Sequence, residues 1–301
     1  MFTDGLLFGF KRLTIEDYPL VQKYYEMADL QESNHNIINL FMWNKIYPVW
    51  FREGDGWLIL VGYHKGEWFL YMPLCSCGCV IEAIRTGEEL FASKGLPYVL
   101  SCYTKEVMEK VLAIDPSFHV EAIRAGYDYI YEFEKLATFS GKKLQKKRNH
   151  INSFMSEYAG RYEYKRMGLE DIEDCLKFLE EWKECEEDTF LQQECQGASF
   201  VLKHFQELPY IGAVVRIDGV VKGFTIGSRL NHDTVQINVE KADKEIRGLY
   251  PFLTREYLVR EWSDQGIKWV DREDDMGKEN IRKAKESLQP AYLVEKYRIF
   301  K

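Results

Sequence analysis

The sequence predicts an α/β (α+β) protein of two tandem domains, each a mixed, mostly antiparallel sheet flanked by helices. Three observations predict this class. Apolar patterns of strand and helix period alternate along the 301 residues. Tight glycine turns join several strand-like runs. The same order of helices, antiparallel meander, strand–helix crossover and closing strand occurs twice, which predicts domains at 1–138 and 139–301.

The first copy begins with helices and continues into a meander whose turns, 54–56 and 64–66, carry the glycine that hairpins favour. Its expected elements are helices at 14–25 and 36–43, strands at 49–52, 57–63 and 68–72, a helix at 80–94, a strand at 98–101, a helix at 105–113 and a closing strand at 127–133.

The second copy repeats this order, and its central hairpin has a tight Asp218-Gly219 turn. Its expected elements are helices at 171–182 and 200–207, strands at 210–217, 220–229 and 234–239, a helix at 250–262, a strand at 268–271, a helix at 278–287 and a final strand at 292–298.

Charge and cysteine content limit the class of protein. The net charge of −8 excludes a general nucleic-acid binder, so any anion site is local. Seven cysteines in no paired pattern suit a reducing cytoplasm, and Cys75-Ser-Cys-Gly-Cys79 lacks the paired knuckles of a zinc site. No apolar run is long enough to span a membrane, and the first residues are a poor secretory signal. We therefore expect a cytoplasmic protein without a metal.

A run of cations opens the second copy. Residues 142–148 hold five basic residues and no acid, within a helix predicted over 142–158 and capped by Ser140. Cations in the first turns oppose the helix dipole and repel one another, which a bound anion would relieve. A solvated basic face is the alternative. The candidate donor-binding residues of this helix are Lys142, Lys143, Lys146, Lys147, Arg148, Asn149 and Asn152.

Three stretches resemble the phosphatidylglycerol lysyltransferase C-terminal domain family: 140–154 (SGKKLQKKRNHINSF), 237–243 and 271–290. The resemblance implies two tandem GNAT-like domains akin to Fem-type peptidoglycan transferases. Family members of known activity move an aminoacyl group from tRNA to an amine or hydroxyl. The resemblance therefore implies aminoacyl-tRNA as the donor.

In the GNAT fold, the turn after a central strand holds the pyrophosphate of coenzyme A. The corresponding stretch here is 240–251, in which Lys244, Arg247 and Gly248 are candidates to hold a phosphate. It has one glycine where the usual pattern has two, so acyl-CoA is the second candidate donor. The alternative is a helix entry whose glycine provides clearance.

Four acids lie within 271–275, directly after a predicted strand, where ligand sites of such sheets occur. Glu273 or Asp274 is expected to bind a substrate ammonium or to act as general base. Glu240, a third candidate catalytic residue, and Asn238, a candidate donor contact, lie at the end of the neighbouring strand and are expected to face the same site. Arg272 is a further candidate donor contact. The alternative is that these acids cap the next helix.

Two functions follow from these features. The first is a cytoplasmic transferase that moves an aminoacyl or acyl group from a phosphate-bearing donor, tRNA or CoA, onto a small or lipid amine or hydroxyl. Catalysis there needs no general base if positioning and oxyanion stabilisation suffice. The second is a non-catalytic module that binds an anionic ligand. In either case the basic helix suits peripheral contact with the inner face of a membrane.

Overall fold

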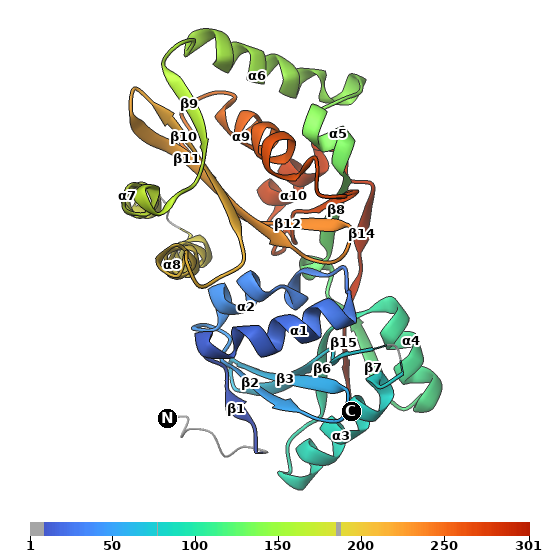
Figure 1. The fold of residues 1–301 in the computed structure, drawn as a ribbon. Helices are drawn as coiled ribbons and strands as arrows, with labels where there is room; N and C mark the ends of the chain where they lie inside the picture. The colour runs from blue at the N-terminus through green and yellow to red at the C-terminus, as the bar shows by residue number, and fades with distance from the viewer. Residues whose placement is uncertain (1–8, 77, 185–187) are drawn as a thin grey trace. The chain divides into compact units, whose positions relative to one another are not determined.

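The computed structural model describes residues 9–76, 78–184 and 188–301 (Figure 1). They form two compact units: unit 1 contains the chain up to Tyr127 together with Val294–Lys301, and unit 2 contains Asp128–Leu293. Each unit has a mixed sheet flanked by helices, as the sequence predicts. None of the helices in the described ranges combines the length and apolar character that crossing a bilayer requires.

Unit 1 has the strand order β1-β2-β3-β4-β6-β15-β7, with β5 paired to β3. Its pairs are antiparallel except β4 with β6. Its strands are β1 Lys11–Arg12, β2 Val49–Glu53, β3 Trp57–His64, β4 Glu67–Tyr71, β5 Leu74–Cys75, β6 Val99–Thr104, β7 His119–Ala122 and β15 Lys296–Phe300. Its helices are α1 Tyr18–Ala28, α2 Ile37–Trp43, α3 Val80–Ser93 and α4 Lys105–Ile114.

Unit 2 has the strand order β14-β8-β13-β12-β11-β10-β9, in which β12 and β13 run parallel. Its strands are β8 Asp128–Glu132, β9 Tyr162–Arg166, β10 Ile211–Ile217, β11 Val220–Arg229, β12 Thr234–Ala242, β13 Trp269–Asp271 and β14 Tyr292–Val294. Its helices are α5 Phe133–Thr138, α6 Gln145–Glu157, α7 Ile172–Glu184, α8 Thr189–Lys203, α9 Leu249–Tyr257 and α10 Glu279–Glu286.

The core of unit 2 lies between the sheet and helices α5, α6 and α9. Phe154 of α6 and Phe252 of α9 are buried with ring centroids 4.7 Å apart, and Val235 and Ile237 of β12 belong to the same apolar cluster. Helices α7 and α8 pack against each other on the other side of this sheet (Figure 1). Both faces of β12 are therefore covered, and its polar side chains are enclosed.

The closing strands differ from the expectation, because the first lies in the other sheet and the second, expected at 292–298, is divided between the two sheets. Strand β8, expected to close the first copy, pairs with β13 in unit 2, where Ile130 faces Asp271. The first part of the expected strand 292–298 is β14, which pairs with β8 in unit 2. Its second part belongs to β15, which lies between β6 and β7 in unit 1, where Lys296 faces Thr104. The division between the units therefore falls after 127 and again after 293, whereas the sequence suggested 138. Periodicity identifies a strand but not its partner.

The start of the basic helix also differs from the expectation. A 3-10 turn, Lys142–Leu144, precedes α6, and Gly141 stands before it at φ 92°, so Ser140 is not the N-cap. In the cysteine segment, β5 ends at Cys75, and Cys79 directly precedes α3. Cys77 lies outside the described residues. Helix α5 and strands β7 and β9 had no counterpart among the expected elements.

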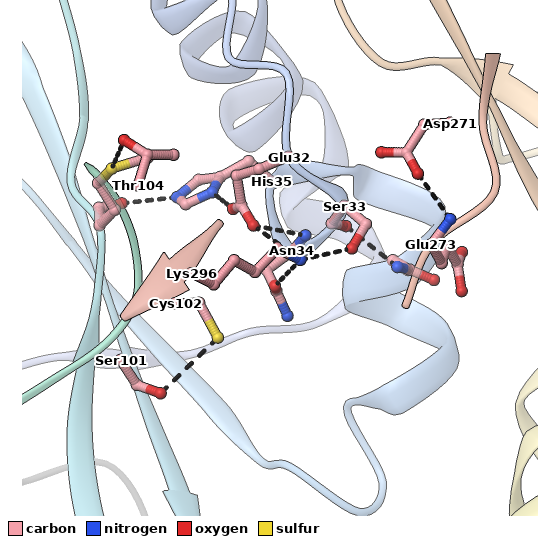
Figure 2. Close-up of polar contacts among 12 residues, drawn as sticks. Glu32, Ser33, Asn34, His35, Ser101, Cys102, Thr104, Asp271, Glu273 and Lys296 are labelled. Atoms are coloured by element: carbon pink, nitrogen blue, oxygen red, sulfur yellow. Dashed lines mark hydrogen bonds and ion pairs between the residues drawn. The ribbon is translucent and has the colours of Figure 1, made fainter. Parts of the chain in front are cut away.

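A buried ionic cluster connects β15 to the segment between α1 and α2 of the same unit (Figure 2). The ammonium of Lys296 lies 3.2 Å from Glu32 and donates to Ser33 Oγ at 2.8 Å and Asn34 Oδ1 at 2.7 Å. Glu32 also contacts His35 Nδ1, while His35 Nε2 lies 2.7 Å from the carbonyl of Met72. Because Lys296 and Glu32 are almost fully buried, each depends on the other for charge balance.

Candidate active site

The site is organised by the place where β12 and β13 separate. Their parallel pairing ends at Gln236 and Asp271. Beyond Gln236, Ile237 of β12 pairs with Gly227 of β11, and Val239 pairs with Ile226, the next residue of β11. Asn238 therefore has no partner in the register and forms a β-bulge. It is buried and its Oδ1 accepts from Ser228 Oγ at 2.8 Å. This hydrogen bond connects the bulge of β12 to the neighbouring strand β11.

Because the bulge adds one residue, the alternation of side chains between the two faces of the sheet shifts by one position after Asn238. Ile237 and Ala242 pack in the same core although they are an odd number of residues apart. Glu240 consequently faces α9, where its Oε2 accepts from Thr254 Oγ1 at 2.8 Å. Lys241 faces α8, where its ammonium lies 2.7 Å from Glu194. One strand thus supplies charged groups to both faces of the sheet.

Arg272 joins the acidic turn to Glu240 on the α9 face. Its Nη2 donates to Glu240 Oε1 at 2.7 Å, and its Nη1 lies 3.5 Å from Thr254 Oγ1. The pair is well enclosed, with 5% of the Glu240 side chain and 17% of the Arg272 side chain exposed. The pKa of Arg272 stays above its ordinary value, because the neighbouring carboxylate outweighs the cost of burial.

Positive charges gather between α6 and the start of α9. Burial lowers the pKa of Lys147, and the nearby charges of Arg272 and Lys146 lower it further. Burial likewise lowers the pKa of His150, with Arg247, Lys146 and Lys147 adding to the effect. We name as the cation cluster the four basic residues that take part in these effects, Lys146, Lys147, Arg247 and Arg272. An anion placed there would reduce the repulsion.

Gly248 lies where α9 begins against the backbone of α6. It has φ 90°, and a Cβ at this position would be 2.2 Å from the carbonyl oxygen of His150. A glycine is therefore required by both conformation and close approach. This is the geometry expected for a clearance glycine.

Glu273 occupies a constrained position in the acidic turn. Its φ is 58°, a conformation that L-residues with long side chains rarely adopt. Its N–H donates to Asp271 Oδ1 at 2.6 Å, a contact drawn in Figure 2, and its carbonyl accepts from Tyr129 N at 3.1 Å. Its carboxylate Oε1 accepts from Gln236 Nε2 at 2.7 Å. Hydrogen bonds thus fix both the backbone and the carboxylate of Glu273.

The surroundings of Glu273 favour its neutral form. Burial raises its pKa to about 8, although Lys285 and the Gln236 amide act in the opposite direction. Burial also lowers the pKa of Lys285, whose ammonium donates to the carbonyl of Arg272. A carboxyl that titrates near neutral pH is suited to taking a proton from an attacking group and returning it.

The other acids of the turn have contacts typical of a structural role. Asp275 is fully buried and accepts from Tyr129 Oη at 2.7 Å, Gly277 N at 2.9 Å and Arg282 Nε at 2.7 Å. Asp274 Oδ1 accepts from Met276 N at 2.8 Å. These backbone contacts lie in the turn before α10, whose N-cap is Lys278 without a side-chain cap, so Asp274 and Asp275 stabilise the turn and do not cap the helix. The Glu273 side chain is held by Gln236.

The remaining predicted residues lie in varied environments. Exposed side chains on or just before α6 are Lys142, Lys143, Lys146, Asn149 and Asn152. Arg148 donates to the carbonyls of Phe139 and Gly141, so it holds the turn before α6. Exposed Lys244 lies over the ring of Trp182, 4.2 Å from its centroid. The structure therefore brings together Lys147, Arg272 and Glu240, and separately binds Glu273 to Gln236.

Three site residues had not been identified from sequence: Gln236, Thr254 and Lys285. The first had a detectable signal, because Gln236, Asn238 and Glu240 are polar residues alternating with apolar ones on a strand that is otherwise a core strand. Thr254 and Lys285 look like ordinary helix residues in the sequence. Among the described residues, no group of histidine, cysteine or acidic side chains is arranged to hold a metal ion.

Comparison with known proteins gives relatives along most of the chain. A conserved protein of unknown function from Bacteroides thetaiotaomicron is 30% identical, with a TM-score of 0.90 over 97% of this chain and 98% of that one. An uncharacterised protein of Mycoplasmoides gallisepticum is 30% identical over 187 residues, which span 61% of this chain and 59% of that protein.

More distant structures share the fold. L-PGS from Bacillus licheniformis is 14% identical with a TM-score of 0.68, covering 94% of this chain and 91% of that one. FemX is 9% identical with a TM-score of 0.62, covering 96% of each chain. A tandem GNAT protein from the clavulanic acid biosynthesis pathway is 12% identical with a TM-score of 0.50, covering 96% of this chain and 97% of that one.

These likenesses agree with the GNAT-like fold that the sequence resemblance implied. The model of one family matches residues 26–300, which is nearly the whole chain. The chain belongs to the phosphatidylglycerol lysyltransferase C-terminal family.

Proposed function

We propose that unit 2 transfers an aminoacyl group from aminoacyl-tRNA to the hydroxyl or amine of an acceptor, with a lipid headgroup as the leading acceptor. Family membership supports the reaction class. The observation that carries the proposal is the turn 271–273, where Arg272 of the cation cluster directly precedes a constrained Glu273 whose pKa is raised to about 8.

The chemistry needs few protein groups, because an aminoacyl ester is already activated. The acceptor oxygen or nitrogen forms a bond to the ester carbonyl carbon, and the bond from that carbon to the ribose oxygen of tRNA breaks. Glu273 takes the proton of the acceptor and returns it to the departing ribose oxygen. Arg272 or Lys147 stabilises the oxyanion that develops on the carbonyl oxygen.

The exposed lysines beside the cation cluster are suited to a phosphate backbone. Lys142 and Lys143 are solvent-exposed in the 3-10 turn before α6, and Lys146 is exposed in the first turn of α6. Arg247 is exposed just before α9. Contacts of this kind release counterions, so binding should weaken steeply as salt is added. Acyl-CoA, which has fewer phosphates, would show a much shallower dependence.

A charge-reversal experiment tests the donor. K143E/K146E changes two exposed side chains, and it should weaken tRNA binding by more than tenfold and reduce the salt slope by about 2. K94E/K105E makes the same change in net charge on exposed lysines of unit 1 and is the control. Equal affinities of the two variants for tRNA would contradict the proposal.

A single-turnover experiment tests the reaction itself. Charged tRNA is mixed with the protein and vesicles containing phosphatidylglycerol, and aminoacyl transfer to lipid is measured by mass spectrometry. Transfer that falls strongly in E273Q supports the proposal. Tight tRNA binding without transfer to any hydroxyl or amine would favour a non-catalytic module, and transfer from acyl-CoA alone would favour the other donor.

A further inference from the structure

We propose that Gln236 is a positioning residue that holds the carboxyl of Glu273 in both of its protonation states. This inference rests on the proposed function, in which Glu273 gains and loses a proton in each turnover. Gln236 is fully buried, and its Nε2 lies 2.7 Å from Glu273 Oε1. A donor at this distance and depth fixes the direction of a carboxylate.

Gln236 is itself fixed by the sheet. It is a central residue of β12, paired with Ser228 of β11 on one side and with Asp271 of β13 on the other. Glu273 is tied to the same strand end through the Asp271 carboxylate that accepts its N–H. The backbones of both residues are therefore fixed by the paired strands, and their side chains form a hydrogen bond where β12 and β13 separate.

The second atom of the Gln236 amide explains how the contact survives protonation. Among the described residues, Oε1 of Gln236 is buried and has no hydrogen-bond partner. An unsatisfied buried acceptor is costly and calls for an explanation. Rotating the amide by half a turn would place this oxygen against Glu273, which can donate to it only when it carries a proton. The orientation of the amide thus follows the proton.

The charged groups around Glu273 do not supply this contact. Lys285 of α10 is a nearby cation and Asp274 is the adjacent acid, while Glu194 of α8 adds a second negative charge. The Lys285 ammonium is already bound to the carbonyl of Arg272. Without Gln236, the Glu273 carboxylate would keep its net electrostatic environment and lose the hydrogen bond that orients it.

The test measures the titration of Glu273 directly, in the full chain without substrate. Isotope-edited infrared spectroscopy follows the glutamate carboxylic acid band, and the band missing from E273Q identifies Glu273. Q236M removes the amide and keeps the volume. We expect the midpoint to rise by about one pH unit, because the stronger of the two hydrogen bonds is the one to the carboxylate. Transfer should fall about tenfold, with the KM for acceptor unchanged.

Q236E gives a second test that keeps the shape of the side chain. Two carboxyls at hydrogen-bonding distance cannot both ionise, so one midpoint should move further upward. T225V is the control, because it removes a different buried hydrogen bond in the same sheet, from Thr225 Oγ1 to Val239 O. It should leave the Glu273 midpoint in place.

The outcomes separate the two proposals. An unchanged midpoint in both Q236M and Q236E overturns the role of Gln236, whatever happens to transfer. A shifted midpoint with full transfer activity in E273Q supports the contact and removes Glu273 from the chemistry. A shifted midpoint accompanied by slower transfer supports both.

Discussion

Arg272 Nη2 donates a hydrogen bond to Glu240 Oε1 at 2.7 Å, although the two residues lie at the ends of different strands. Arg272 follows β13 and Glu240 lies near the end of β12, so the ion pair spans the opening between two parallel strands. Thr254 of α9 contacts both partners. This arrangement couples the acidic turn to the helix that begins beside the cation cluster.

The Arg272–Glu240 pair should show strong coupling in a double-mutant cycle. Removing one partner leaves a buried charge without its counterion, so R272M and E240L should each lower the free energy of unfolding by about 3 kcal/mol. The double variant should lose much less than the sum. Urea unfolding measures this. The exposed pair of Arg161 and Asp218 is the control, and D218N should change the free energy of unfolding only slightly, because solvent screens an exposed ion pair.

Stability should fall with pH because of Glu273. Its folded pKa of about 8 lies above its ordinary 4.5, so between these values the folded state binds more protons than the unfolded state. The carboxyl therefore destabilises the fold progressively from pH 4.5 to pH 8. E273Q should be more stable than the parent at pH 8 and equal to it near pH 4.5, as measured by urea unfolding.

The control for this pH experiment is E279Q, an exposed glutamate of α10. Its difference from the parent should not vary in the same way over this range. A constant difference between E273Q and the parent from pH 4.5 to pH 8 would contradict burial as the source of the raised pKa.

Gly248 and Gly141, two glycines of positive φ but different ψ, should respond differently to alanine. Gly248 and Gly141 have φ near 90°, but only at Gly248 would a Cβ meet another backbone, the His150 carbonyl at 2.2 Å. G141A should cost about 2 kcal/mol for its backbone alone, because φ 92° with ψ 159° is a conformation that essentially only glycine adopts. G248A should cost roughly 3 kcal/mol, because α6 must also move. Equal melting temperatures of the two variants would show that α6 does not pack as closely as described.

The buried cluster of unit 1 should tolerate paired removal better than single removal. K296M leaves Glu32 without its cation and should destabilise the protein by about 3–5 kcal/mol. Adding E32Q removes the remaining charge, so K296M/E32Q should recover part of that loss. Thermal unfolding of the parent, the single variants and the double variant measures this. No recovery in the double variant would argue that the amine acts through its hydrogen bonds to Ser33 and Asn34.

Local sequence determined most of the elements. The alternating run 220–229 became β11 with the expected ends, and the basic segment became α6 after a 3-10 turn. Such elements follow from the periodicity of apolar side chains, which a short stretch of chain encodes by itself. The basic helix was also recognisable because its cations oppose the usual rule for charges near a helix start, and the acidic turn because four acids directly follow a predicted strand.

Only the tertiary structure decided which strands are partners and which charges meet. Strands β8 and β15 exchanged sheets relative to the expectation, because a strand pattern carries no information about its neighbours. The bulge at Asn238 directs the Glu240 side chain toward α9 and the Lys241 side chain toward α8. Arg272 reaches Glu240 because β13, which it follows, pairs with β12. Charge pairing depends on distances between segments far apart in the chain, and those distances exist only once the sheet has formed.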